Sequence, residues 1–381
     1  MGVPLLLVLG AACGDGGLRK VPVGPDTTGG TFARAVWRVR VTPGFTGPGV
    51  DDSTVYFASA NHEIVAVRKG NGSIRWTSQS IGNGFPIGTA LAVAGGVVLY
   101  PETNIYAFNV SDGQLKWTYR DSSGSAGGFF RLTTNGGTIF GGSNVGLVVA
   151  VDLSTGALRW RRKISTFAGQ VIVFAPVVSG GLLYVTYRNV DVLSSGAVVA
   201  MDTTTGAEVW RQNLPGTSAA LGGGGMLEGL AVSANRVIVS SYDGQLRGFS
   251  ADSGVLVWTV PIPGGLGGNG SDTRPIALAN GILVAGSILD LLVGLDPQSG
   301  AELWRLVGQH VGVSLTSPIV SSGDSFLLQF DGEVARVFAA TGATVWRTTA
   351  PPEPSLAFGS PTSDSLFVYA AGDSGVYALR R

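Results

Sequence analysis

Residues 148–160 read VVAVDLSTGALRW, and the order of residue types in them is informative. The stretch begins with Val148–Val151, which has the β-branched composition of a buried strand. Asp152 follows and can accept hydrogen bonds from turn amides, while Gly156 supplies the positive φ that a short hairpin loop commonly needs. Trp160 stands four residues after the glycine. The stretch therefore predicts a β-hairpin with a tryptophan on its second strand.

The same hairpin pattern recurs along the chain. Successive tryptophans are separated by about 44 residues on average, within the range of four-stranded propeller blades. Two earlier strands precede most hairpins, and proline often stands at the start of the first, where no ladder donor is needed. Each repeat is therefore expected to form one antiparallel blade of four strands. The tryptophans are Trp37, Trp76, Trp117, Trp160, Trp210, Trp258, Trp304 and Trp346, and the glycines are Gly72, Gly113, Gly156, Gly206, Gly254, Gly300 and Gly342.

The two ends of the chain complement one another. Trp37 lies on a strand of the fourth type, 35–39, with no first three strands before it. The C-terminal residues supply strands at 366–369 and 376–379 and then stop without a tryptophan. Pairing these ends gives eight blades and closes the ring, which protects the strand edges. We expect an all-β, eight-bladed β-propeller of four-stranded antiparallel blades that occupies residues 31–381 as a single domain.

The recurring tryptophan has two possible roles, a wedge against the neighbouring blade or a surface on which ligands stack. A tryptophan that recurs once per blade on the outermost strand favours the wedge. Each would bury about 150–250 Å², and truncation to alanine would cost about 3–5 kcal/mol. We therefore expect the tryptophans and glycines to be structural residues.

Composition excludes several classes of protein. Hydrophobic residues make up 45% of the chain and charged residues 13%, which excludes a disordered polymer. The 59 glycines follow no Gly-X-Y period, so the chain is not collagen. The net charge is zero, with no long run of either sign, and gives no reason to expect nucleic-acid binding or a polybasic membrane patch.

The first residues have the features of an export signal. Residues 3–12 read VPLLLVLGAA, an apolar run too short to span a bilayer but suited to a secretory signal. Residues 9–13 resemble the lipobox of bacterial lipoproteins, and Cys13 is the only cysteine. We expect a lipoprotein signal peptide at 1–12, lipidation of Cys13 and a flexible tether at 13–30. No Lys or Arg precedes the apolar run, which leaves open a true start upstream.

The repeat resembles the PQQ-type propeller repeat, because Arg or Thr follows every tryptophan, and not WD40, in which Asp does. PQQ-type repeats occur in quinoprotein alcohol and glucose dehydrogenases and in the non-enzymatic outer-membrane assembly lipoproteins known as BamB. A lipobox, a tether and a bare propeller are similar in plan to the BamB group. The resemblance implies a monomeric, lipid-anchored scaffold in the bacterial envelope that binds envelope proteins and assists outer-membrane protein assembly. The outer membrane, facing the periplasm, is favoured, and inner-membrane sorting stays open.

The quinoprotein alternative requires a cofactor site. The dehydrogenases it resembles have adjacent cysteines over the cofactor, a cation held by carboxylate and amide groups, and a catalytic aspartate. A hard cation needs about six or more converging oxygens. The acidic residues of this chain mostly stand in turns or on the exposed hairpin strand, as do Asp152, Asp202, Asp296, Glu208 and Glu302. We expect no catalytic residue, metal or cofactor, and keep a quinoprotein-like enzyme or a small-ligand or carbohydrate-binding propeller as alternatives.

Other motifs give no catalytic site. The two histidines, His62 and His310, are far apart and are interpreted as surface or loop residues. Residues 265–270 match a dinucleotide fingerprint formally, but the sequence after them predicts a strand where the fingerprint needs a helix. Residues 222–225 are interpreted as a flexible connection. Longer segments at 188–195, 216–228 and 264–274 are candidate contact regions for partners, because binding residues concentrate in loops.

Overall fold

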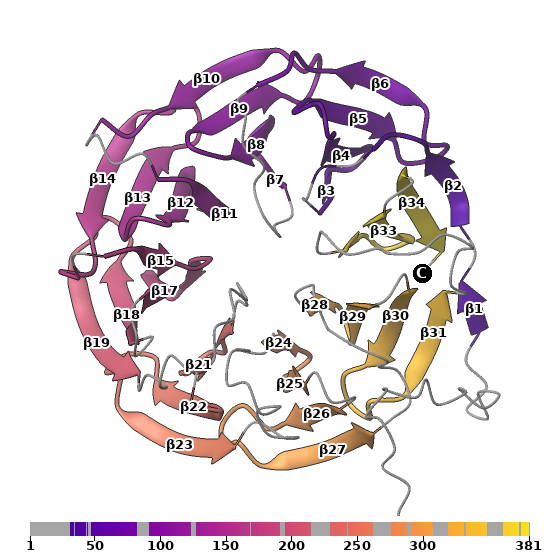
Figure 1. The fold of residues 1–381 in the computed structure, drawn as a ribbon. Coiled ribbons are helices and arrows are strands. Elements are labelled where there is room, and N and C mark those ends of the chain that lie inside the picture. The colour runs from indigo at the N-terminus through magenta and orange to yellow at the C-terminus, as the bar shows by residue number, and fades with distance from the viewer. Residues whose placement is uncertain are drawn as a thin grey trace, which may run out of the picture.

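The protein is an eight-bladed β-propeller (Figure 1). The computed structural model describes residues 31–33, 35–42, 44, 47–81, 91–122, 127–167, 169–190, 195–214, 229–241, 243–261, 276–287, 291–307, 319–330, 333–348, 361–372 and 375–380. Across these residues all regular secondary structure is β, and none forms a helix long and apolar enough to cross a bilayer. The predicted signal and tether, Cys13, His310 and the glycine-rich segments 222–225 and 265–270 lie outside the described residues.

Blades 1 to 6 each consist of strands that follow one another in the sequence, and we number the blades in chain order. Blade 1 contains β3 (Gly49–Val50), β4 (Thr54–Ala58), β5 (Ile64–Arg68) and β6 (Ile74–Thr77), and blade 2 contains β7 (Ala92–Ala94), β8 (Val97–Pro101), β9 (Ile105–Asn109) and β10 (Leu115–Tyr119). Blade 3 contains β11 (Phe129–Asn135), β12 (Thr138–Ser143), β13 (Leu147–Asp152) and β14 (Leu158–Lys163). Blade 4 contains β15 (Val171–Val173), β16 (Val177–Ser179), β17 (Leu182–Asn189), β18 (Gly196–Asp202) and β19 (Glu208–Leu214).

The second half of the ring repeats this order. Blade 5 contains β20 (Leu230–Val232), β21 (Arg236–Ser240), β22 (Gln245–Ser250) and β23 (Leu256–Pro261), and blade 6 contains β24 (Ile276–Ala279), β25 (Ile282–Ser287), β26 (Leu291–Leu295) and β27 (Glu302–Val307). Blade 7 contains β28 (Val320–Ser322), β29 (Ser325–Phe330), β30 (Glu333–Phe338) and β31 (Thr344–Thr348). Blade 8 joins β32 (Thr362–Ser363), β33 (Phe367–Gly372) and β34 (Gly375–Arg380) to β2 (Ala35–Val39).

The ring closes through the two ends of the chain, as the sequence predicted. β2 pairs antiparallel with β34, with Trp37 opposite Ala378 and Val39 opposite Val376. Figure 1 shows the first strand of each blade toward the centre of the ring and the Trp-bearing fourth strand at its rim. The pairing places an N-terminal strand at the rim of the C-terminal blade, so the eighth sheet holds the circle together.

Two strands add to the predicted pattern. β1 (Thr31–Ala33) lies along the outer edge of blade 7 and pairs in parallel with β31, with Thr31 opposite Trp346. In blade 4, two strands pair with β17: β16 pairs with its residues 182–184, and β15 pairs with its residues 187–189. Blades 4 and 7 therefore have five strands each.

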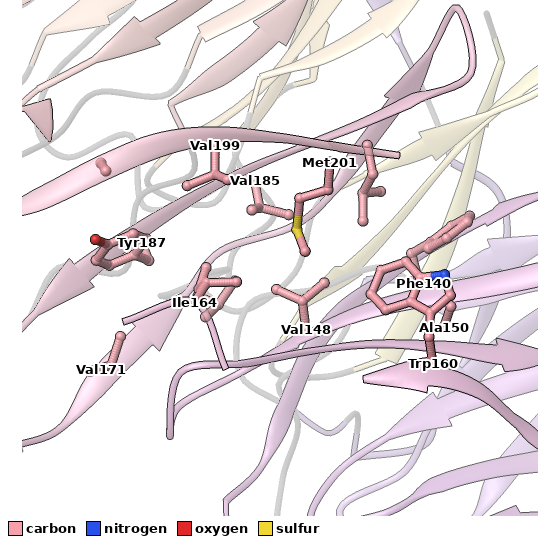
Figure 2. Packing of buried hydrophobic residues seen from close by; sticks show 13 residues of the cluster. Phe140, Val148, Ala150, Trp160, Ile164, Val171, Val185, Tyr187, Val199 and Met201 are labelled. Carbon is pink, nitrogen blue, oxygen red and sulfur yellow. The ribbon is translucent and has the colours of Figure 1, made fainter. Parts of the chain in front are cut away.

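The core lies between the blades. The second strands of blades 1 to 3, β4, β8 and β12, are buried at every residue, because a neighbouring blade covers each face of the sheet. Figure 2 shows how apolar side chains of blades 3 and 4 meet in one such layer. From blade 3 come Phe140, Val148, Ala150 and Trp160, and from blade 4 come Val185, Val199 and Met201. Such layers make each blade depend on its neighbours for burial.

Candidate functional site

The seams between blades are built from the repeated tryptophan and glycine. The seven glycines of the repeat have φ between 68° and 74°, the left-handed region that favours glycine. Each also lies under the indole of the preceding blade. At Gly156 an added Cβ would stand 2.6 Å from Cε3 of Trp117. The turn geometry and the stacked ring therefore each require glycine at this position.

The indole nitrogens fasten each blade to the next. Seven of the tryptophans donate an Nε1–H hydrogen bond to a backbone carbonyl three residues before the glycine of the following blade, at 2.6–3.2 Å. Trp346, in blade 7, is buried, and its Nε1 has no partner within the described residues. The matching acceptor position in blade 8 follows Arg380 and lies outside the described residues. In the described structure, the seam between blades 7 and 8 therefore lacks the indole hydrogen bond that the other seams have.

A β-bulge precedes every tryptophan. In blade 3, Trp160 pairs with Ala150 and Leu158 pairs with Val151, so that Arg159 is the extra residue on its strand. The same one-residue shift occurs in all eight blades. A bulge bends the edge strand and re-aims the next side chain. The constant spacing of glycine and tryptophan in the sequence reflects this bulge, but spacing alone did not reveal it.

The turn aspartates accept hydrogen bonds from backbone amides of their own hairpin loops. Asp152 accepts hydrogen bonds from the amides of Ser154 and Thr155 at 2.9 and 3.0 Å, and Asp202 and Asp296 do the same in blades 4 and 6. The guanidinium of Arg159 also donates to Asp152 at 2.7 Å, and this bond and the hydroxyl donors lower the pKa of that carboxyl. Glu208 and Glu302 lie exposed on the rim strands, each paired with an arginine. These acids serve the blades as turn and rim residues.

The seam that closes the ring carries a cluster of polar groups. Lys69 Nζ lies 2.7 Å from Asp364, and Asp364 accepts the hydroxyl hydrogen of Tyr369 at 2.9 Å. Burial alone would raise the pKa of Asp364, but these bonds and two backbone amides lower it to about 2. Burial, and next the hydrogen bond to Asp364, raises the pKa of Tyr369. The carbonyl of Lys69 accepts the Trp37 indole, so Lys69 joins blade 1 to both chain ends.

Cations on the rim strands reach across other seams. Arg161 Nη1 of blade 3 lies 2.7 Å from Asp121, which follows the last strand of blade 2. Arg162, the next residue, donates to the carbonyl of Thr205 in blade 4 at 2.7 Å. Alternating side chains of one strand thus contact the blades on its two sides, as the two-residue period of a strand requires.

A cavity of about 330 Å³ lies among the inner segments of blades 3 to 7. Its lining is mostly apolar, with Arg131, Thr133 and Ser321 as polar side chains, and Thr133 donates to the carbonyl of Pro176 at 2.5 Å. Within the described part of the chain, no three His, Cys, Asp or Glu side chains gather closely enough to hold a metal ion. His62, expected in a loop, lies in the turn between β4 and β5 with φ of 60°.

The candidate contact regions are only partly described. Of the three longer segments, residues 188–190 and 195 are described, whereas 216–228 and 264–274 lie outside the described residues. Asn189 at the end of β17 donates to Ser195 through its side chain at 3.1 Å and accepts the hydroxyl hydrogen of Ser165 at 2.8 Å. The described structure therefore places the base of one such loop and leaves the others as predictions.

Comparison with known proteins gives a family and a fold. The family model described as outer membrane protein assembly factor BamB matches residues 26–187 and 146–381. The outer membrane protein assembly factor BamB of Yersinia pestis is 28% identical over 314 residues, which cover 74% of this chain and 68% of that protein. The crystal structure of BamB from Moraxella catarrhalis has a TM-score of 0.64 at 17% identity and covers 92% of this chain and 97% of that one.

An enzyme shares the same fold. The quinohemoprotein alcohol dehydrogenase of Comamonas testosteroni has a TM-score of 0.65 at 14% identity, covering 92% of this chain and 76% of that one. At this level of identity the likeness concerns the fold alone, because one fold hosts many functions.

Proposed function

The chain belongs to the family of outer membrane protein assembly factor BamB, and from this we propose that it is a non-enzymatic scaffold that binds protein partners in the bacterial envelope. The family's name supports a role in outer-membrane protein assembly. The observation that carries the proposal is the family match over most of the chain. In addition, the repeated polar groups of the ring already form hydrogen bonds with one another. Indole nitrogens and turn carboxylates are engaged in seams and hairpins.

A rigid ring suits this role. Its faces and rim present separate surfaces that move together, because neighbouring blades share apolar layers. The layer between blades 3 and 4 holds the thirteen buried residues drawn in Figure 2. Several partners can therefore be held at fixed distances by one molecule. Binding of this kind needs no reacting group. It depends on the shape and polarity of the protein surface.

We also propose a lipid anchor. In this arrangement residues 1–12 are a signal peptide, Cys13 carries the lipid, residues 13–30 form the tether and residues 31–381 form one propeller domain. Each buried methylene of an acyl chain contributes about 0.8 kcal/mol, so more than one chain on Cys13 would hold the protein stably at a membrane. We favour the outer membrane, with the propeller in the periplasm.

The scaffold role is tested by affinity capture of the full chain from envelope extracts, with an unrelated periplasmic propeller as the matched bait. We expect outer-membrane assembly proteins to be enriched on this chain and not on the control bait. Repeated capture with no such enrichment would contradict the proposal.

The central cavity supports a second candidate, a small-ligand site. Its volume of about 330 Å³ and its few polar groups are of the kind that binding pockets have. Adding pyrroloquinoline quinone with calcium, and measuring binding and dye-linked alcohol oxidation, separates the two candidates. Saturable binding with turnover would establish the enzyme, and absence of both favours the scaffold.

A further inference from the structure

The rim of the propeller takes an added strand at one place. β1 pairs in parallel with β31, with Thr31 opposite Trp346, Phe32 opposite Arg347 and Ala33 opposite Thr348. The added segment is short and uncharged and lies outside the four strands of blade 7. It begins opposite the tryptophan, just past the bulge. A blade edge of this protein therefore has the geometry for strand addition.

One rim strand lacks the usual protection against such pairing. Natural edge strands are blunted by charged side chains, among other devices. Of the eight rim strands, all described, seven carry a charged residue, and only β23 has none. The three residues before its tryptophan are exposed: Val255 at 60%, Leu256 at 51% and Val257 at 46%.

The neighbouring rim strands also carry exposed apolar residues and add no net charge. Val209 in blade 4 and Leu303 in blade 6 both stand directly before the rim tryptophan, as Val257 does in blade 5. Val209 is 50% exposed and Leu303 is 51% exposed. The charges on these two strands compensate each other locally, because Arg211 pairs with Glu208 at 2.6 Å and Arg305 pairs with Glu302 at 2.5 Å. The rim strands on either side of β23 therefore add no net charge to this surface.

Blades 1 to 3 differ at the same position. There the bulge residue before the tryptophan is Arg75, Lys116 or Arg159, each exposed. An added strand on those edges would meet a cation at the bulge. The rim is thus divided into a basic arc over blades 1 to 3 and an uncharged edge at blade 5.

We propose that the outer edge of β23 is a docking site for an extended, uncharged segment of a partner protein, which adds to blade 5 as a further strand. This inference rests on the scaffold function and names the surface and the chemistry of one partner. The backbone of residues 258–260 would supply the hydrogen bonds, in the place that residues 346–348 hold toward β1. Val255, Leu256 and Val257 would pack against apolar residues at alternate positions of the segment.

The probe is a fluorophore-labelled peptide of alternating threonine and valine, about eight residues long, as befits a strand. The full chain is compared with the variant Val257→Arg. This substitution copies the arginine that blades 1 and 3 carry at the same position, so the fold is expected to persist, and thermal melting checks it. The matched control is Leu303→Arg in blade 6. A peptide N-methylated at alternate residues keeps the side chains and removes backbone donors.

We expect the peptide to bind the full chain and the Leu303→Arg control alike. In Val257→Arg, binding should be at least about tenfold weaker, because a charge without a partner would lie at the bulge beside the added strand. The N-methylated peptide should not bind. Failure of the peptide to bind the full chain, or equal binding by Val257→Arg, overturns the proposal. So does dimerisation of the full chain that Val257→Arg abolishes, because a second copy would then occupy the edge.

Failure at this edge is distinguishable from failure of the scaffold role. If the peptide does not bind while the full chain still enriches outer-membrane assembly proteins, the β23 site is wrong and the scaffold stands. If neither occurs, both proposals fall.

Discussion

The indole nitrogen of Trp37 donates a hydrogen bond to the carbonyl oxygen of Lys69 at 2.6 Å, which joins the strand that completes blade 8 to the hairpin between β5 and β6 of blade 1. The same tryptophan covers Gly72, where φ is 70°. Ring closure therefore depends on two contacts at the seam as well as on strand pairing within blade 8. This relationship recurs at six other seams, whereas the described residues contain no such acceptor for Trp346.

Replacing Trp37 by phenylalanine removes the indole donor and leaves the half-buried carbonyl of Lys69 without it. We expect a loss of about 1–3 kcal/mol in the free energy of unfolding, measured by urea denaturation. Trp346→Phe is the matched control, because this buried indole has no acceptor among the described residues. That variant should lose less than Trp37→Phe. An equal or larger loss at Trp346 would contradict the role given to the hydrogen bond.

Glycine in the hairpin is required for two separable reasons. Gly156→Ala places a Cβ against Trp117 and also strains a φ of 74°. Gly137→Ala strains a similar φ of 77° but meets nothing within 4 Å. We expect about 1–2 kcal/mol for the control and a further 1–3 kcal/mol for Gly156→Ala from overpacking, at order of magnitude. Thermal and urea unfolding measure both, and similar losses in the two variants would refute the stacking contribution.

Acid should weaken the closing seam through Asp364. Its pKa is lowered to about 2 in the folded protein, below the ordinary aspartate pKa of 3.8. The carboxylate therefore stabilises the fold above the unfolded pKa, and this contribution is lost as the pH falls from about 4 to about 2. We expect the loss to be about 2 kcal/mol.

Urea unfolding of the wild type and of Asp364→Asn between pH 5 and 2 would measure this contribution. The asparagine variant should be less stable at pH 5 and should show a flatter dependence on pH. A Lys69→Met variant tests the cation that lies 2.7 Å from the carboxylate. Identical pH profiles in wild type and Asp364→Asn would exclude Asp364 as the source.

The proposed anchor is tested by Cys13→Ala. Without lipid on Cys13 the protein should move from the membrane pellet to the soluble periplasmic fraction, because nothing else proposed holds it at the bilayer. Ultracentrifugation and immunoblotting measure the split, with Gly14→Ala as the neighbouring control that keeps the thiol. An unchanged pellet fraction for Cys13→Ala would refute lipid attachment.

The number of blades and the way the ring closes were predictable from the sequence. Each blade has one tryptophan four residues after a glycine, except the blade of Trp37, and this long-period signal does not depend on local propensity. The incomplete repeat at each end required the pairing that β2 and β34 make. These predictions are confirmed.

Other features had no signal of this kind. β1 has three residues, too few for a visible alternation, and its partner β31 is more than 300 residues away in the sequence. The bulge at Arg159 has an equivalent in every blade, so the spacing between glycine and tryptophan never varies and offers no contrast that would reveal it. The uncharged edge of β23 was readable in the residues 255–261, but only the structure shows these residues at the rim and exposed.

The central cavity was also beyond the sequence. Its lining comes from five blades and includes Arg131 and Ser321, which are 190 positions apart. Convergence of this kind depends on the radius of the ring and on which side chain each inner strand turns inward. Neither quantity is encoded in a single repeat.

The order of β1 and β2 along the chain has a mechanical consequence. A pull applied from the N-terminal side reaches the short parallel ladder at Thr31–Ala33 before it reaches the strand that carries Trp37. The ladder can detach while the wheel stays shut, since blade 7 keeps its own four strands. We therefore expect the three residues of β1 to separate from β31 before β2 separates from β34.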